Sequence, residues 1–486
     1  MPSRPTDRPP ATLTAATAQP ELPAAEAHQR LPAHAEPHLL ADAAPPSLAL
    51  LAEQEAHART RAALRDLEAA AARFVPPGFL RLLGATRLTD LAPGDAVERK
   101  MTILFSDIRG FTGLCEGMSP RDTFRFINSF LGAMEPVVAA HRGFIDKYIG
   151  DAVMALFPGG ADDAVAAGVG LLGALEAFNQ SRGREGRPRI RIGVGLNHGM
   201  VMLGTVGGGD RLSGTVVSDA VNLAARLEEA TRTYGTAMLV SEATLYGLQG
   251  AAARQVRFVD RIRVKGKRQP QSIYEIFDAD PAPLRAAKAG GRAEFEQAVA
   301  AYHLRAPDQA LPLLERCLEA APDDGPARLY LDRCREYLAS GRYAGTGELD
   351  AFLAWRDEFT LGIAVIDEQH HELLDAMNRL VPHLQAGEAV GGAEVLAFLE
   401  RYAVEHFGTE EELMRAHGYP FLAEHLVEHA NFVDFFARLR RDVQAGRGGR
   451  LDHVFQAQVF LLDWFANHST STDRHLTRWL RGRGVV

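Results

Sequence analysis

Cysteines and long apolar runs are both scarce in this sequence. The three cysteines, Cys115, Cys317 and Cys334, lie far apart and include no CxxC pair. This spacing argues against a disulfide framework or a thiolate metal site, and it favours a reducing compartment. No apolar run approaches the roughly 18 residues that cross a bilayer, and the start, "MPSRPTDRPPATLTAATAQP", lacks the apolar core of a signal peptide. We therefore expect a cytoplasmic protein with no membrane partner.

A basic stripe is also missing. Positive and negative side chains are interspersed, and the formal net charge is −9. Without clustered Lys and Arg interleaved with aromatic residues, we expect no nucleic-acid partner. The chain is nevertheless long, at 486 residues with 47% hydrophobic residues, which is enough for about two to four domains. Histidine is unevenly spread, because ten of the 17 histidines follow residue 350.

The N-terminal part of the chain changes character twice. Residues 1–46 are rich in Ala and Pro, with few bulky apolar side chains, and predict a disordered tail. Residues 47–97 form a helical segment whose Ala, Leu, Glu and Arg pattern stops before "VPPGF". This helix either pairs with its copy in a dimer or packs alone as a solvated helix, because its apolar seam is short for a coiled coil. Residues 98–280 then alternate strand-like and helix-like patterns, which predicts an α/β or α+β domain.

The C-terminal part is predicted to be helical. Residues 290–340 show three helical patterns whose Ala, Tyr and Leu spacing resembles one tetratricopeptide (TPR) unit. A single such unit cannot bury its own apolar face, so we expect a TPR-like connector that docks on a neighbour. Residues 350–482 carry four long amphipathic patterns, which predict an all-α four-helix bundle. The chain is therefore predicted to be a multidomain protein.

Two aspartates in the α/β region stand at the ends of strand-like runs. Asp107 follows the apolar run "MTILFS", and Asp151 lies in the tight turn of "YIGDAV". A lone aspartate at a strand end is more often a turn former than a ligand. On adjacent strands, however, two carboxylates would meet, and hard oxygen donors of this kind hold Mg²⁺ together with nucleotide phosphates. The tract that follows Asp107 contains Gly110, Phe111 and Thr112, and its backbone amides could approach a phosphate.

Four motifs in register strengthen the interpretation of these aspartates as metal ligands. "FSDIRGFT", "DKYIGDAVMALF", "DAVNLAARLE" and "VKGK" resemble the catalytic domain of the class III adenylate and guanylate cyclases across residues 98–280. The resemblance implies an α+β domain with a ferredoxin-like core. It also implies that Asp107, Asp151 and the carbonyl oxygen of Ile108 hold two Mg²⁺ or Mn²⁺ ions, and that Phe111 and Thr112 contact the substrate.

The same resemblance assigns roles to three further residues. Asn222 would orient the ribose, Arg226 would stabilise charge on the phosphate in the transition state, and Lys265 would contact the terminal phosphates. Asn222 and Arg226 are four residues apart, so they share one face of a helix. Taken alone, Arg226 could form a surface salt bridge, but its place in "NLAARLEE", at the border between inward and outward residues, favours the catalytic role. Ser218 stands where the family commonly has glycine before the Asp of "GDAVN", which puts the turn geometry there in question.

The choice of base depends on Lys147 and Thr215. Adenylate cyclases of this family place Lys and either Asp or Thr at these positions, whereas guanylate cyclases place Glu and Cys there. A Lys donor suits adenine N1 and a Thr hydroxyl can accept from the 6-amino group, so ATP is the expected substrate and a guanylate cyclase is the alternative. The resemblance further implies a homodimer with composite sites, in which one subunit supplies the metal aspartates and its partner supplies the other residues.

The histidines of the bundle recur at helical spacing beside carboxylates. His406 and Glu410 are four residues apart, as are His425 and His429. A single histidine on an apolar helix face is usually a hydrogen-bonded core residue. Five imidazoles and two carboxylates spread over four helices exceed the needs of one tetrahedral Zn²⁺, so two metal ions bridged by carboxylates are the economical count.

The motifs "IDEQHHELL", "HFGTEEELM", "EHLVEH" and "WFANHSTSTD" resemble the bacteriohemerythrins. The resemblance implies a di-iron centre in which Glu410 and Asp473 bridge the irons. His425, His429 and His468 would bind one iron, and His370 and His406 would bind the other, which keeps an open position for O₂ or NO. Glu411, Glu412 and His417 would then belong to the ordinary surface.

Together these patterns predict an adenylate cyclase that forms 3′,5′-cyclic AMP and pyrophosphate and is regulated by O₂ or redox state at the di-iron site. The direction of regulation is open, and the connector at 290–340 is expected to carry the coupling. An alternative from another class is an oxygen-binding or scavenging protein with an inactive nucleotide module.

Overall fold

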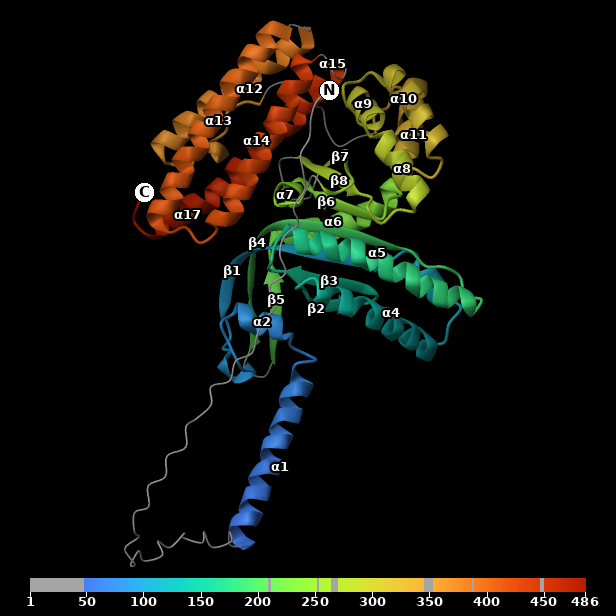
Figure 1. Cartoon of the computed structure of the whole chain (residues 1–486), viewed down its shortest axis with the longest axis vertical. Helices are drawn as coiled ribbons and strands as arrows, with labels where there is room; N and C mark the ends of the chain where they lie inside the picture. The colour runs from blue at the N-terminus through green and yellow to red at the C-terminus, as the bar shows by residue number, and fades with distance from the viewer. Residues whose placement is uncertain are drawn as a thin grey trace, which may run out of the picture. The chain divides into compact units, whose positions relative to one another are not determined.

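The computed structural model describes residues 48–208, 211–250, 253–263, 270–344, 353–386, 389–445 and 450–486. By contacts the chain divides into two compact units, residues 1–68 and residues 69–486. Helix α1 (Leu48–Ala71) is the element described at the start of the chain (Figure 1). Glu55 and Arg59 form an exposed ion pair along it. Its pairing in a dimer stays a prediction. The predicted tail, residues 1–46, lies outside the described residues. No helix in the described part of the chain is long and apolar enough to cross a membrane.

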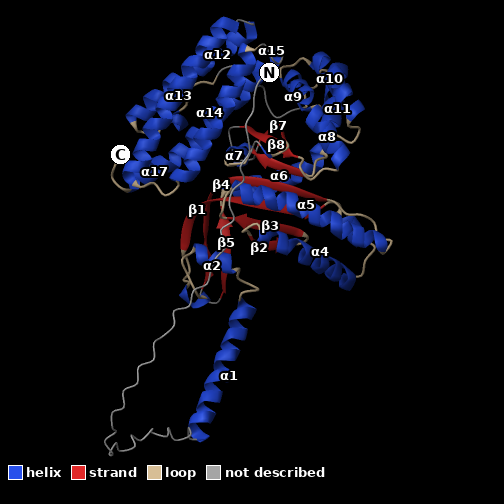
Figure 2. Ribbon diagram, in the orientation of Figure 1, coloured by secondary structure: helices blue, strands red, loops and turns tan. Residues whose placement is uncertain are grey.

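The region between residues 96 and 277 combines one mixed sheet with helices on both faces (Figure 2). Its strands are β1 (Ala96–Ile108), β2 (Phe144–Ile149), β3 (Ala152–Phe157), β4 (Ile192–Gly208), β5 (Arg211–Val217), β6 (Met238–Ser241), β7 (Val256–Arg263) and β8 (Pro270–Ile276). Its helices are α3 (Phe111–Cys115), α4 (Pro120–Ala140), α5 (Ala161–Arg184), α6 (Asp219–Tyr234) and α7 (Glu242–Tyr246), and α2 (Pro77–Leu82) and η1 (Leu88–Asp90) precede the region. The strand order is β2-β3-β1-β4-β6-β8-β7, with β5 paired to β4. The predicted α+β domain is confirmed.

Strand β1 occupies the middle of this sheet. It pairs antiparallel with β3 and with β4, and β4 continues parallel to β6. Successive side chains of a strand point to opposite faces, so Leu104 packs under α4 and α5 while Ile103 and Phe105 pack on the face that α6 covers. The packing on both faces of β1 therefore fixes the position of its last two residues, Asp107 and Ile108, at the end of the strand.

Helix α6 lies unusually close to strand β4. A Cβ atom at Gly195 would stand 2.1 Å from the backbone nitrogen of Glu228, so only glycine fits there. Ser218 caps the helix, since its Oγ accepts from the Ala220 N–H at 3.0 Å and donates to the Met200 carbonyl at 2.6 Å. Serine at position 218 is thus compatible with a well-formed turn before α6.

The predicted connector is a set of helices packed on the sheet. These helices are α8 (Ala282–Gly290), α9 (Arg292–His303), α10 (Pro307–Ala320) and α11 (Gly325–Ser340). Arg257 of β7 is 1% exposed and pairs with Glu275 at 2.6 Å and with Asp324 at 2.7 Å, at the start of α11. Asp260 of the same strand accepts from Tyr234 at the end of α6. The connector therefore docks where α6 ends.

The C-terminal region is all helical, as predicted. Its elements are η3 (Asp357–Phe359), α12 (Ala364–Ala386), α13 (Ala389–His417), α14 (Leu422–Gln444), α15 (Arg450–Gln456), η4 (Ala457–Asp463), α16 (Trp464–His468), η5 (Ser469–Asp473) and α17 (Arg474–Gly482). The fourth long amphipathic pattern is interrupted by two π-helical turns, η4 and η5. Turns of this kind widen a helix locally and often occur at functional sites. The second of them separates His468 from Asp473, so two residues five positions apart lie on one side of the helix.

Two candidate metal centres

Seven donor side chains converge inside the bundle. Each is at most 5% exposed, and they come from α12, α13, α14, α16 and η5. The seven are His370, His406, Glu410, His425, His429, His468 and Asp473. The sequence-predicted set of histidine and carboxylate residues is thus brought together by the fold.

Glu410 stands between two groups of imidazoles. Its Oε2 lies 3.4 Å from Nε2 of His425 and 3.2 Å from Nε2 of His429. Its Oε1 lies 3.7 Å from Nε2 of His406. The two oxygens of this carboxylate therefore face opposite sides of the centre.

Asp473 divides its oxygens in the same way. Its Oδ1 lies 3.0 Å from Nε2 of His468 and 3.5 Å from Nε2 of His425. Its Oδ2 lies 3.5 Å from Nε2 of His370. Three imidazoles thus gather on one side and two on the other, with both carboxylates between them. This is a donor arrangement for two cations that share two carboxylates.

Inward-facing atoms of this group lack hydrogen-bond partners among the described residues. They are Nε2 of His425, His429 and His468 and both carboxylate oxygens of Glu410 and of Asp473. Buried polar atoms without partners are costly, and a cation coordinated by nitrogen and oxygen removes that cost. The donor set, which mixes neutral imidazole with carboxylate, suits iron and other transition metals. The residues present therefore fit a metal centre.

The outward nitrogens of three imidazoles have polar partners. Nδ1 of His406 lies 3.1 Å from Oε1 of Gln369, and Nδ1 of His468 lies 3.0 Å from Oε2 of Glu428. Nδ1 of His429 lies 3.4 Å from Oε1 of Glu411, whose side chain is 22% exposed. Partners of this kind fix the ring orientation and the tautomer of a metal ligand. Glu411, predicted to be an ordinary surface residue, is instead partly buried beside the centre.

The electrostatics of the centre follow from burial and from these carboxylates. Burial lowers the pKa of His406 to about 3, so its imidazole is neutral, as a metal ligand requires. Burial also disfavours protonated His468, but Asp473 and Glu428 outweigh it and raise the pKa of His468 to about 10. Without a cation, His468 therefore carries the proton that balances the carboxylates.

A second group of donors lies at one edge of the sheet, where the sequence predicts a metal site. Asp107 ends β1, and Asp151 occupies the turn between β2 and β3. The two half-buried carboxyl groups share a hydrogen bond. Burial, followed by the Asp107 carboxylate, raises the pKa of Asp151 to about 7. One oxygen of Asp151 has no partner within the described residues, so this pair also has a vacant coordination direction for a cation.

The remaining predicted residues of this site lie on other elements. Lys147 is on β2 and forms an ion pair with Asp146 at 3.2 Å, and Thr215 is on β5. Asn222 and Arg226 share one face of α6. Within the described residues, no hydrogen bond or ion pair joins these four residues to Asp107 or Asp151.

Four other predicted residues belong to the cyclase-like region. Ile108 is buried at the end of β1, and Phe111 and Thr112 open the short helix α3 after two intervening residues. Lys265 lies outside the described residues.

Exposed apolar side chains surround the β4–β5 hairpin. Met202, Val206 and Val217 share one face of the hairpin and are 45–64% exposed. Apolar side chains exposed together on one face are typical of a surface that contacts another protein. Thr215 lies on the same hairpin.

Comparisons with known proteins match the two halves of the chain separately. Residues 96–277 match the family model described as the adenylate and guanylate cyclase catalytic domain, and residues 361–480 match that described as the hemerythrin HHE cation binding domain.

Individual relatives divide in the same way. An adenylate cyclase of Anabaena cylindrica is 42% identical over 210 residues, which is 42% of this chain and 42% of that protein. A bacteriohemerythrin of Stenotrophomonas maltophilia is 34% identical over 124 residues, which is 26% of this chain and 78% of that protein. Among solved structures, the adenylyl cyclase CyaB of P. aeruginosa is 31% identical and aligns with 38% of this chain and 96% of its own, with a TM-score of 0.35. This chain thus spans about two fifths of the Anabaena protein's length.

Proposed function

The chain belongs to the hemerythrin family through residues 361–480 and carries an adenylate and guanylate cyclase catalytic domain at residues 96–277, and we propose that it is an adenylate cyclase regulated by a di-iron centre. We set the two functional domains at residues 98–280 and 350–482, joined by the connector at 290–340. The observation that carries the proposal is the hydrogen-bonded pair of Asp107 and Asp151 within the matched cyclase region.

The aspartate pair is the proposed site of catalytic metal. Asp107, Asp151 and the carbonyl oxygen of Ile108 would hold two Mg²⁺ or Mn²⁺ ions. These ions would supply Lewis-acid activation of the ribose 3′-hydroxyl and the α-phosphate of ATP. The 3′-hydroxyl would lose its proton to solvent and its oxygen would bond to the α-phosphorus, while the bond from that phosphorus to the leaving pyrophosphate breaks, which yields 3′,5′-cyclic AMP.

The other residues of the site bind and orient the substrate. Asn222 would hold the ribose, and Arg226 would stabilise negative charge on the phosphate as it develops. Phe111 and Thr112 would approach the phosphates through their backbone amides, and Lys265 would contact the terminal phosphates.

ATP is the proposed substrate because of Lys147 and Thr215. The ammonium group can donate to adenine N1 and the hydroxyl can accept from the 6-amino group, whereas guanine presents the reversed pattern. The likeness to an adenylate cyclase at 42% identity supports the same choice. A guanylate cyclase is the alternative within this class, and comparing ATP with GTP turnover decides between them.

A homodimer is proposed because the resemblance to the class III cyclases implies that one subunit supplies the metal aspartates and its partner supplies Thr215, Asn222 and Arg226. The exposed apolar side chains of the β4–β5 hairpin offer a surface for the second copy. Two composite sites would then form, each with residues from both chains.

The bundle is proposed to hold two irons. His425, His429 and His468 would bind one iron, His370 and His406 would bind the other, and Glu410 and Asp473 would bridge them. Bound iron would supply O₂ or NO binding and one-electron redox chemistry. The surrounding side chains exclude water from the centre, because every donor is buried.

Cyclic AMP formation by iron-loaded protein tests the proposal directly. We expect the rate to differ between deoxygenated, oxygenated and oxidised protein, with absorption spectra recorded in parallel. His406→Ala should remove the difference and keep basal activity. Equal rates in all three forms would contradict regulation. If wild-type protein with Mn²⁺ and ATP forms no more cyclic AMP than the Asp151→Ala variant, the result would favour an oxygen-binding protein with an inactive nucleotide module.

A further inference from the structure

A buried ion pair joins the bundle to the central strand of the sheet. Nζ of Lys100, near the start of β1, pairs with Oε1 of Glu428 on α14. The two side chains are only 8% and 10% exposed. Buried charges of this kind are seldom tolerated unless each is paired, so the position of each group depends on the other.

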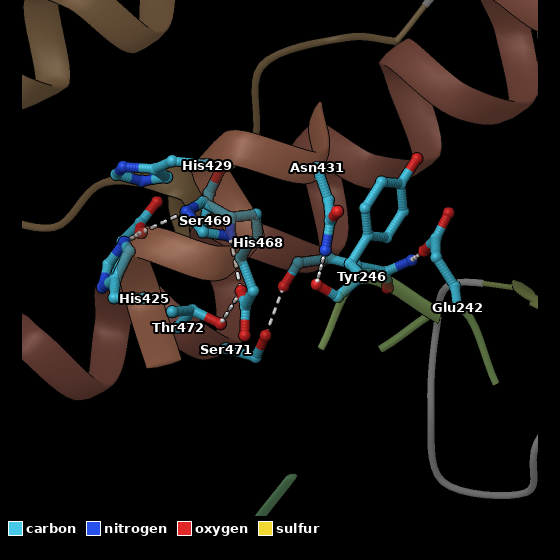
Figure 3. Close-up of polar contacts among 12 residues, drawn as sticks. Glu242, Tyr246, His425, His429, Asn431, His468, Ser469, Ser471 and Thr472 are labelled. Carbon is cyan, nitrogen blue, oxygen red and sulfur yellow. Dashed lines mark hydrogen bonds and ion pairs between the residues drawn. The ribbon is translucent and has the colours of Figure 1, made fainter. Parts of the chain in front are cut away.

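The second oxygen of Glu428 contacts the metal-binding side of the bundle. Oε2 lies 3.0 Å from Nδ1 of His468 and accepts from the Thr472 hydroxyl at 3.0 Å. Figure 3 shows His468 and Thr472 close together beside His425. The other nitrogen of His468 faces Asp473 at 3.0 Å. One carboxylate therefore connects a residue of the cyclase domain with a proposed iron ligand.

Strand β1 extends the same connection to the aspartate pair. Lys100 and Asp107 are seven residues apart on one strand, which is paired with β4 continuously from Ala96 to Ile108. An extended strand paired along its length is stiff, and at about 3.3 Å per residue these two residues lie about 23 Å apart. A shift at Lys100 is thus transmitted along an element that carries a proposed catalytic metal ligand.

We propose that Lys100 is a positioning residue for the iron centre, which acts through Glu428 on His468 and thereby links that centre to strand β1. This inference rests on the proposed function and names the residue through which regulation passes. A histidine that binds metal through Nε2 donates its Nδ1–H to a carboxylate, and that carboxylate raises the basicity of the ligand. Lys100 holds Glu428 in place and balances its buried charge. Because coupling is reciprocal, a residue that changes iron affinity also responds to iron.

The same interface offers a contact that bypasses the iron ligands. Nδ2 of Asn431 donates to the carbonyl oxygens of Tyr246 and of Leu248, the latter at 3.0 Å (Figure 3). Asn431 lies on α14 with Glu428, and its side chain hydrogen-bonds to Tyr246 and Leu248 and not to His468. Asn431→Ala therefore weakens the contact between bundle and sheet without removing a partner of a proposed ligand, and it is the matched control.

Iron affinity of the full-length chain tests the inference. Iron-free protein is titrated anaerobically with Fe(II) in competition with a coloured chelator, and the absorption spectrum is recorded after oxidation. We expect Lys100→Met to lower the Fe(II) affinity about 10-fold and to shift the absorption bands, as losses of outer hydrogen-bond partners do. Lys100→Arg and Asn431→Ala should bind Fe(II) with wild-type affinity. The ratio of cyclase rates with and without iron should move towards one in Lys100→Met alone.

Two results would overturn the inference. One is a Lys100→Met protein with wild-type Fe(II) affinity and spectrum; the other is an equal loss of affinity in Asn431→Ala, which would indicate general loosening of the interface. If Lys100→Met does not fold, Glu428→Gln breaks the same ion pair from the bundle side by removing the negative charge, and it must lower the affinity. Wild-type protein that binds iron but forms no cyclic AMP would contradict the proposed function and not this inference, because the affinity measurement needs no turnover.

Discussion

The two candidate metal centres differ in how much of each centre one chain supplies. In the bundle, five imidazoles and two carboxylates from one chain face one another, fully buried. At the edge of the sheet, the donors that the described residues bring together are Asp107 and Asp151, which are half-buried. The proposed functions account for the difference, because a resident cofactor can be enclosed within one bundle, whereas a nucleotide that must bind and leave needs a more open site, proposed here to be completed by a second chain.

The largest expected effect separates the two centres. Asp151→Asn keeps the size of the side chain and removes its charge. We expect the cyclase rate to fall about 1,000-fold, because metal-held charge stabilisation is worth several kcal/mol. Cyclic AMP formation with Mn²⁺ and ATP measures this loss, and the iron content should stay at the wild-type level. If the variant also lost iron, the two metal centres would not be independent of each other.

The converse substitution addresses the bundle. Glu410→Ala removes a carboxylate that contacts both groups of imidazoles. We expect Fe(II) affinity to fall by more than about 100-fold, because the loss of an outer partner alone costs 10- to 100-fold. Metal analysis after gel filtration measures the iron that remains. Basal activity of iron-free protein should match the wild type, and a matching loss of activity would show that the centres are not separable.

Much of each centre could be predicted from the sequence because its spacing is local. His425 and His429 are four residues apart on α14, and the helical repeat alone brings them to one face. Asp107 was predictable because an apolar strand ends beside it. Such inferences need only the geometry of one element.

Contacts that depend on tertiary packing could not be predicted in this way. Lys100 and Glu428 are 328 positions apart, and neither carries a local signal that names its partner. No sign of the π-helical turn η5 could be seen in the sequence either. Over five residues, the amphipathic pattern of a π-helix cannot be distinguished from that of an α-helix. The connector was expected to carry the coupling between the domains, whereas the bundle also contacts the sheet directly through Lys100.

A buried histidine of the sheet, unlike the bundle histidines, lies outside both groups of metal donors. His198 is 5% exposed and its Nδ1 lies 2.9 Å from the Thr102 hydroxyl. Burial, followed by the charge of Lys100, lowers the pKa of His198 to about 3. Below pH 6.5 the unfolded chain therefore binds a proton that the folded chain does not, so stability falls as the pH falls.

The expected size of this effect follows from the pKa difference. Between pH 6.5 and 5 the free energy of unfolding should drop by about 2 kcal/mol through His198, at 1.36 kcal/mol for each pH unit. Urea denaturation of wild type and His198→Gln at both pH values measures it. The substituted protein should lose less stability on acidification, and an equal loss in both would exclude His198 as the cause.

The experiment with the smallest expected effect tests whether a second chain completes the site at Asp107 and Asp151. Asp107→Ala and Arg226→Ala should each be inactive, since every homodimer then lacks one component of both composite sites. When equal amounts are unfolded and refolded together, random pairing gives half mixed dimers with one intact site each, so about a quarter of the wild-type rate should return. Iron content should be the same in each variant and in the mixture, because every bundle holds its own donors. A mixture as inactive as its components would mean that a single chain builds the whole nucleotide site, and the contrast between an open and a closed centre would then need another cause.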